Sequence, residues 1–243
     1  MRPKFIPFAL LLVTLTAGLA AGQSIPTDAG ESIKRGNAKH ARAEYLAAIE
    51  AYQQVPPHAG EVYSQALYNI GVCYYELWRT EDAIVMYRKA VAERADRYPK
   101  ALFALGVALE DLKRSEDAKA AYRQIVAGSS GQVTDAAHFR LGLLFAREND
   151  YERAATHFRK AISGETTPGS HNNLGVMLAI KGRLQEAERE FEVALRQSGG
   201  SFADAAHNLR LCRSLLKKSA EDSITSLRVV TTTKTSGKDS GIE

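Results

Sequence analysis

The sequence has few cysteines, little net charge of either sign and few long apolar runs. Two of its 243 residues are cysteine, and the formal net charge is +4, from 32 basic and 28 acidic side chains. The basic residues form no dense block with interleaved aromatics, which argues against a nucleic-acid partner. Beyond the first twenty or so residues, no apolar run reaches the ~20 residues that span a bilayer. The pattern therefore excludes a membrane bundle and disfavours a nucleic-acid-binding protein.

Motifs for catalysis and ligand binding are also missing. The six histidines follow no HExxH or CxxC…H spacing, and the chain has no G-x-S-x-G and no glycine-rich phosphate-binding loop. Acidic pairs such as Glu81-Asp82 and Glu116-Asp117 fall in the first turns of expected helices, where negative charge suits the helix dipole. We therefore expect no enzyme activity, no metal or other cofactor and no small-molecule substrate.

Residues 1–22 have the composition of a signal peptide. Two basic residues precede an apolar core over 6–17, and small residues follow as far as Gly22. Cleavage after Ala20 or Gly22 satisfies the small-x-small rule. We expect an exported protein, periplasmic or secreted, with residues 23–28 as a short linker. If the segment stays uncleaved it becomes an anchor, and it is the only membrane contact that we expect.

The sequence does contain a repeated pattern, in a composition typical of a folded soluble protein, with 45% apolar and 25% charged residues. Five glycines are separated by 35, 35, 36 and 33 residues: Gly36, Gly71, Gly106, Gly142 and Gly175. Twelve residues after each glycine stands an alanine: Ala48, Ala83, Ala118, Ala154 and Ala187. Four residues further on stands an aromatic: Tyr52, Tyr87, Tyr122, Phe158 and Phe191.

This spacing predicts pairs of helices that approach each other closely. Residues four apart share one helix face, so the alanine and the aromatic form one stripe. Small residues let two helix axes come together, and the aromatic fills the space beyond that contact. Proline- and glycine-containing stretches separate the units, at 56–57, 96–99, 128–131, 164–169 and 198–200. Because one helix pair cannot bury its stripe alone, stacking of neighbours is needed to complete the core.

The pattern resembles the tetratricopeptide repeat, a unit of about 34 residues. The best copy spans 64–97, with Tyr68-Asn69-Ile70-Gly71 at its opening, and the weakest is the first, where Arg35 replaces an aliphatic residue. The resemblance implies an all-α, right-handed α-solenoid of about five helix pairs and a C-terminal capping helix. The expected repeats are approximately 29–63, 64–98, 99–134, 135–167 and 168–202, with the capping helix at 203–218. The composition of 219–243 indicates a disordered tail, in which Val229 and Val230 could mark a short binding segment.

The repeat register also bears on the cysteines and on two histidines. Two cysteines in an exported protein first suggest a disulfide. However, Cys73 and Cys212 occupy the same position in elements four repeats apart, which at ~8–10 Å per helix layer puts the thiols tens of ångströms apart. A disulfide needs Cα atoms within about 7 Å, so we predict two buried packing residues. His138 and His171 likewise share one position, four residues before their glycines, which indicates shared packing.

By resemblance, the first helices of successive repeats line a concave groove. The groove positions lie three residues before each repeat glycine, one after it and four after it. The predicted partner-binding residues are Asn37, Tyr68, Val72, Tyr75, Phe103, Val107, Glu110, Phe139, Leu143, Asn172 and Val176. The middle of this stripe is apolar and aromatic, as expected of a surface that binds a protein or peptide. Two alternatives remain: the superhelix closes on itself, or the capping helix or tail fills the groove.

Two functions are compatible with these features. The first is an exported scaffold or adaptor that binds a helix or an extended segment of a partner protein in the apolar groove. The second is a non-catalytic accessory subunit of a cell-envelope enzyme or assembly machine.

Overall fold

The computed structural model describes residues 28–162 and 168–217, which contain helices and turns and no β-strand. The predicted signal segment at 1–22, the linker up to residue 27 and the predicted tail at 219–243 lie outside the described residues. Within the described residues, no helix is both long enough and apolar enough to cross a membrane.

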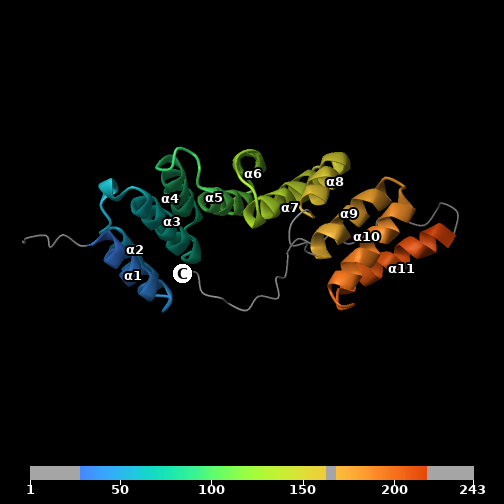
Figure 1. The fold of residues 1–243 in the computed structure, drawn as a ribbon, viewed down its shortest axis with the longest axis horizontal. Helices are drawn as coiled ribbons and strands as arrows, with labels where there is room; N and C mark the ends of the chain where they lie inside the picture. The colour runs from blue at the N-terminus through green and yellow to red at the C-terminus, as the bar shows by residue number, and fades with distance from the viewer. Residues whose placement is uncertain (1–27, 163–167, 218–243) are drawn as a thin grey trace, which may run out of the picture.

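Ten of the helices form five consecutive pairs (Figure 1). The pairs are α1 (Ala29–His40) with α2 (Tyr45–Tyr52), α3 (Glu61–Glu76) with α4 (Thr80–Ala92), α5 (Pro99–Asp111) with α6 (Ser115–Gly128), α7 (Gln132–Arg147) with α8 (Tyr151–Lys160), and α9 (Pro168–Ile180) with α10 (Leu184–Gln197). A further helix, α11 (Ala203–Lys217), packs on α10 and α9, and a short 3-10 helix, η1 (Pro57–Ala59), leads into α3. The predicted all-α solenoid of five pairs plus one terminal helix is confirmed. We call the five pairs repeats 1 to 5.

Each helix packs mainly on the helices that precede and follow it in the chain. The result is an elongated stack, with α1 and α2 at one end and α10 and α11 at the other (Figure 1). In such a stack each repeat contacts only its neighbours, so stability is close to a sum over repeats and their interfaces. A local change in one repeat can therefore alter the contact between the repeats that precede it and those that follow it.

Within each pair the helices meet at the repeat glycine. An added Cβ on Gly71 would lie 2.6 Å from the Tyr87 ring, and one on Gly106 would lie 2.5 Å from the Tyr122 ring. The other three glycines face the aromatic side chain of their own pair in the same way. The five repeat alanines are all 0% exposed. The glycine, alanine and aromatic therefore act as predicted, since a side chain at the glycine position would displace a buried ring.

The turn inside each pair holds one residue in the left-handed backbone region. These residues stand seven positions after the repeat glycine: Ala43, Trp78, Lys113, Asn149 and Gly182, with φ from 58° to 76°. Left-handed backbone costs a residue with a Cβ roughly 1–2 kcal/mol. Trp78 is the largest of the five, and its side chain is 92% exposed.

Both cysteines are buried and free. Cys73 lies in α3 of repeat 2, and Cys212 lies in α11 at the C-terminal end of the stack. Burial raises the pKa of each thiol to about 11, which keeps both in the protonated, unreactive form at neutral pH. The predicted role as buried packing residues is confirmed.

Candidate partner-binding surface

The predicted groove positions lie on the first helix of each repeat. One is exposed, Asn37, and five are half-buried: Tyr68, Val72, Tyr75, Phe103 and Val107. The other five are buried: Glu110, Phe139, Leu143, Asn172 and Val176. The expectation that the whole stripe faces solvent is therefore wrong for these five positions. The accessible part, which we call the N-terminal concave surface, consists of the six residues Asn37, Tyr68, Val72, Tyr75, Phe103 and Val107.

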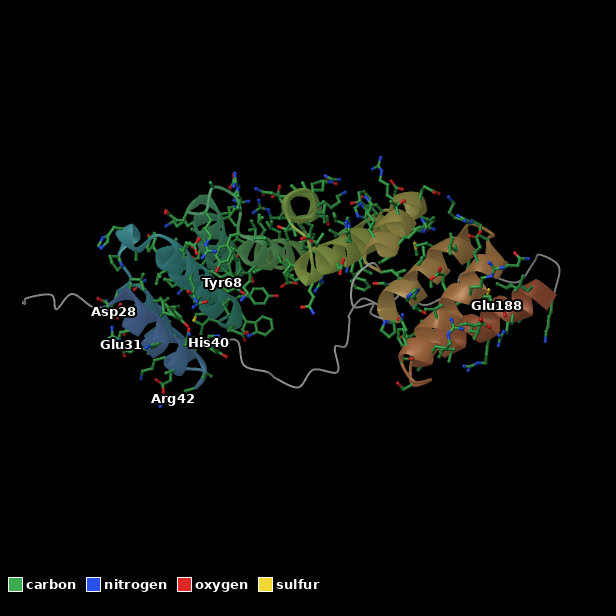
Figure 2. The ribbon with its side chains drawn as sticks, viewed as in Figure 1. Asp28, Glu31, His40, Arg42, Tyr68 and Glu188 are labelled. Carbon is green, nitrogen blue, oxygen red and sulfur yellow. The ribbon has the colours of Figure 1, made fainter. Side chains whose placement is uncertain are left out.

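The aromatic residues of this surface pack on the hydrophobic core and are half-buried. The ring of Tyr68 on α3 (Figure 2) packs against Tyr87 and Tyr98, with centroids 5.8 and 5.7 Å away. The Phe103 ring lies 5.6 Å from that of Tyr122. Because the three partner rings belong to the buried core, Tyr68 and Phe103 are fixed in place while part of their area stays accessible. Such preset aromatic area lowers the entropy lost on binding.

Polar groups border the aromatic residues at two points. The Tyr52 hydroxyl donates to Asn37 Oδ1 at 2.7 Å, and Asn69 Nδ2 lies 3.4 Å from the same oxygen. This leaves the Asn37 Nδ2 group as a donor on an exposed side chain. On the other side, the Tyr75 hydroxyl donates to Asp111, and burial together with this carboxylate raises the pKa of Tyr75 to about 12.

Asn69 and Asp111 are contributors that the sequence reading missed. Asn69 stands two residues before its repeat glycine and Asp111 five after, and the three-position rule counts neither of them. Each contacts a first helix of the neighbouring repeat. The sequence could have shown both residues, because each is polar and stands directly next to a predicted groove position, Tyr68 or Glu110.

Glu110 is buried and joins three helices. Its carboxylate accepts from the Tyr122 hydroxyl at 2.8 Å and from Arg147 Nη1 at 3.1 Å, and Arg140 lies 3.8 Å away. These contacts tie α5 to α6 and to α7. A buried carboxylate needs such partners, since its charge costs several kcal/mol when it is left unpaired. Glu110 therefore does not face solvent as expected, and it is left out of the N-terminal concave surface.

The remaining buried positions are also occupied by packing. Phe139 meets Phe158 edge to face at 5.7 Å, and Leu143 and Val176 belong to the main hydrophobic core. Asn172 donates to Asn173 Oδ1 at 3.1 Å and accepts from Asn208 Nδ2 of α11 at 2.8 Å. The terminal helix thus reaches the concave side of α9, as in the alternative in which it covers part of the groove.

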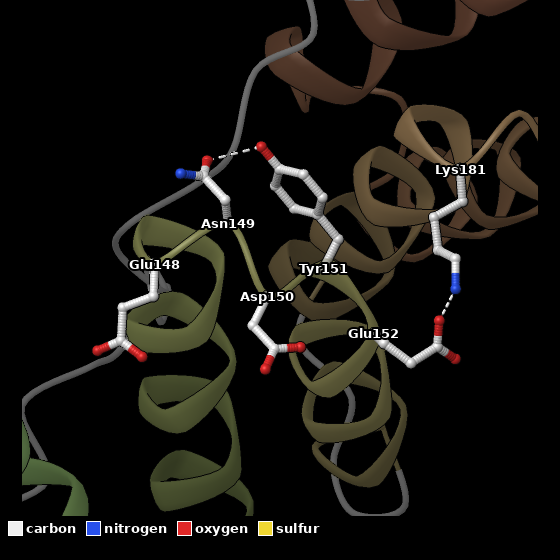
Figure 3. Close-up of a pocket in the computed structure, with 6 residues that line it drawn as sticks. All are labelled: Glu148, Asn149, Asp150, Tyr151, Glu152 and Lys181. Carbon is white, nitrogen blue, oxygen red and sulfur yellow. Dashed lines mark hydrogen bonds and ion pairs between the residues drawn. The ribbon is translucent and has the colours of Figure 1, made fainter.

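A hollow beside the α7–α8 turn gathers three carboxylates (Figure 3). Glu148 is paired with Lys119 at 2.7 Å, Asp150 accepts from the Arg153 backbone N–H at 3.1 Å, and Glu152 is paired with Lys181. Each carboxylate therefore already has a cationic or N–H partner. Among the described residues, no three His, Cys, Asp or Glu side chains are arranged to hold a metal ion. The hollow is stabilised by ion pairs and gives no basis for a cation site.

The comparison with known families decides the identity of this repeat. A profile of the tetratricopeptide repeat matches residues 79–133, 103–171 and 139–202, which together cover about half of the chain. The chain is a tetratricopeptide repeat protein. The resemblance seen in the sequence is thereby confirmed. No curated protein sequence matches this tetratricopeptide repeat protein.

Solved structures similar to this tetratricopeptide repeat protein share its fold. The MamA protein superposes with a TM-score of 0.58 at 24% identity, over 70% of this chain and 92% of that one. The pilF protein of Pseudomonas aeruginosa gives a TM-score of 0.64 at 18% identity, over 78% and 84%. YrrB, described as a TPR protein with an unusual peptide-binding site, gives 0.55 at 21%, over 79% and 93%. At these identities the similarity shows a common fold.

Proposed function

We propose that this tetratricopeptide repeat protein is an exported scaffold that holds a segment of a partner protein on its N-terminal concave surface. The observation that carries the proposal is the set of three half-buried rings, Tyr68, Tyr75 and Phe103, that pack on the hydrophobic core and keep part of their area accessible. Aromatic side chains of this kind are favoured interface anchors. The peptide-binding site of YrrB supports the same use of the fold, and the signal-like composition of residues 1–22 supports export. The proposal gives the chain no catalytic role.

The dimensions of the surface favour a short extended segment. It crosses α1, α3 and α5, and three helices about 10 Å apart span about 20 Å. An extended chain rises about 3.3 Å per residue, so about six residues cover this distance. The Asn37 amide can donate to the main chain of such a segment.

Two acidic side chains at the edge of the surface indicate that the bound segment carries a basic residue. Glu76 and Asp111 occupy the same position in repeats 2 and 3, and both are exposed. Glu76 follows Tyr75 on α3, and Asp111 accepts a hydrogen bond from the Tyr75 hydroxyl. A partner segment with apolar side chains next to a lysine or arginine would complement this edge. The proposed ligand is therefore an extended, apolar segment of about six residues that carries a basic neighbour.

The test begins with a random-peptide display selection on the purified chain and continues with the affinity of one enriched peptide. The Tyr75→Ala, Phe103→Ala double variant should bind that peptide at least about 30-fold more weakly, because truncation of an aromatic anchor often costs 2 kcal/mol or more. Raising the salt concentration should weaken binding much less, since the anchors are apolar.

The matched control is Trp78→Ala, which removes an equally large aromatic group from an exposed turn outside the N-terminal concave surface. It should leave the affinity unchanged. An unchanged affinity of the folded double variant would remove the binding site from this surface.

A further inference from the structure

In repeats 4 and 5 one pair of side chains joins the two helices, and the same two positions carry different chemistry in repeats 2 and 3. The positions lie four residues before the repeat glycine and fifteen after it. They hold Leu67 and Met86 in repeat 2, Leu102 and Ala121 in repeat 3, His138 and His157 in repeat 4, and His171 and Glu190 in repeat 5. The apolar pairs of repeats 2 and 3 give way to titratable pairs in repeats 4 and 5.

The repeat 4 pair is a histidine–histidine hydrogen bond. The two Nδ1 atoms are 3.0 Å apart, and the ring centroids are 5.2 Å apart. Such an N–H···N bond holds one hydrogen between the two nitrogens, so one ring donates and the other accepts. A first extra proton can go to an Nε2 atom, and the bond survives. A proton on the accepting Nδ1 places two N–H groups against each other and breaks the bond.

The surroundings of this pair oppose any added positive charge. The His157 ring stacks on Phe145 at 5.4 Å and 15°. Three cationic groups, Lys119, Arg123 and Arg153, lie 5.2 to 5.8 Å from the same Phe145 ring. Lys119 is neutralised by Glu116 and Glu148, at 2.6 and 2.7 Å.

The other charges near the histidine pair lie on α7 and α8 themselves and on the helices that pack against them. Lys160 of α8 lowers the pKa of both histidines, whereas Asp135 of α7 acts on His138 in the opposite sense. Helix α9 packs on the other side of α8, and its titratable group is His171. Helix α5 carries two acids: Glu110 is paired with Arg140 and Arg147, and Asp111 accepts a hydrogen bond from Tyr75. Burial is the main cause that lowers the pKa of His157 to about 4, followed by His138, Lys160 and Arg123.

Repeat 5 places a carboxylate at the second position. His171 Nδ1 lies 2.7 Å from Glu190 Oε2, and both side chains are largely buried. A carboxylate can accept a charge-assisted hydrogen bond from the imidazole, and it carries no hydrogen of its own that would oppose the donor. The same place in the repeat therefore lacks the conflict between two N–H groups that the repeat 4 pair can develop.

From this juxtaposition we infer that repeat 4 is an acid-sensitive joint in the solenoid, at which a proton on the accepting Nδ1 of the His138–His157 pair loosens α7 from α8, whereas repeat 5 has a carboxylate in place of the second ring. The sign follows from the lowered pKa values. A histidine whose pKa falls on folding stabilises the fold fully above its ordinary value of 6.5, and this stabilisation is lost as the pH falls towards about 4. The inference concerns the stack alone and holds whether or not the N-terminal concave surface binds a partner.

The experiment is hydrogen–deuterium exchange of the whole chain at about pH 7.5 and about pH 5, with protection factors corrected for intrinsic exchange. Protection in α7 and α8 should fall about tenfold more than in α3 and α4, whose equivalent pair is apolar. Equal changes in the two helix pairs would overturn the inference.

Two variants copied from the chain's own repeats sharpen the test. His138→Leu with His157→Met reproduces the repeat 2 pair and should abolish the extra loss of protection at low pH. His157→Glu reproduces the repeat 5 pair and should also remove the extra loss, because a carboxylate in place of the second ring leaves no two N–H groups to oppose each other. Either folded variant decides the matter, because a wild-type response in it would show that the pair is not the sensor.

Discussion

Repeats 2 and 5 are built on the same internal contact and differ on their concave side. In both, an added Cβ on the repeat glycine would lie 2.6 Å from the aromatic ring, and the repeat alanine is 0% exposed. Yet Val72 on α3 is half-buried, whereas Val176, at the same position on α9, is 1% exposed. The contact within a pair is thus fixed by the repeat pattern, while the accessibility of the concave side depends on what lies next to it.

The buried polar groups show the same difference. Residues 169–179 of α9 are buried on every face, including the side chains of Ser170, His171, Asn172 and Asn173. Asn208 of α11 bonds to one of these amides. In repeat 2 the amide that corresponds to Asn173, Asn69, is half-buried and contacts the exposed Asn37. One fold unit therefore forms an open surface in one place and a closed interior in another.

The largest expected effect tests whether the shared contact is equally important in both repeats. Tyr87→Ala and Phe191→Ala should each destabilise the chain by about 3–5 kcal/mol, because both leave a cavity at a position that neighbours cannot fill. Urea denaturation gives the two values. If one variant loses less than half as much free energy of unfolding as the other, the contact between the two helices is not equally important in repeats 2 and 5.

The next effect isolates the concave side. Val176→Asp should cost about 3 kcal/mol, because the carboxylate enters a buried site, and Val72→Asp only about 1 kcal/mol, because its site is partly open to water. The two substitutions are chemically identical and stand at the same position in the repeat. Equal losses of stability in urea denaturation would contradict the accessibility difference on which the N-terminal concave surface rests.

The smallest effect concerns the turns. Trp78 and Gly182 occupy the same left-handed position, with φ of 59° and 76°. Trp78→Gly should raise stability by about 0.5–1 kcal/mol through relief of backbone strain, and Gly182→Ala should lower it by a similar amount. Opposite changes in melting temperature are the expected result. A loss of stability in Trp78→Gly would mean that the exposed indole makes a stabilising contact.

His138 and His171 show which properties the position in the repeat predicts and which it does not. Their shared position indicates shared packing, and both do lie at the contact between the two helices of a repeat. Their chemistry differs, because the partner in the second helix is His157 in one case and Glu190 in the other. Those partners can be assigned only when it is known which residues of the two helices face each other.

The sequence by itself determined the helix pairs, the terminal helix and the separation of Cys73 from Cys212. These features depend on residues close together in the chain, and their spacing repeats five times, so local periodicity suffices to read them. The tertiary structure alone decided which groove positions are accessible, that Glu110 joins three helices, and which side chain faces each histidine. The physical reason is that these properties arise between elements: Glu110 is buried by Tyr122, Arg140 and Arg147, and Asn172 is bonded by Asn208, which lies 36 residues away.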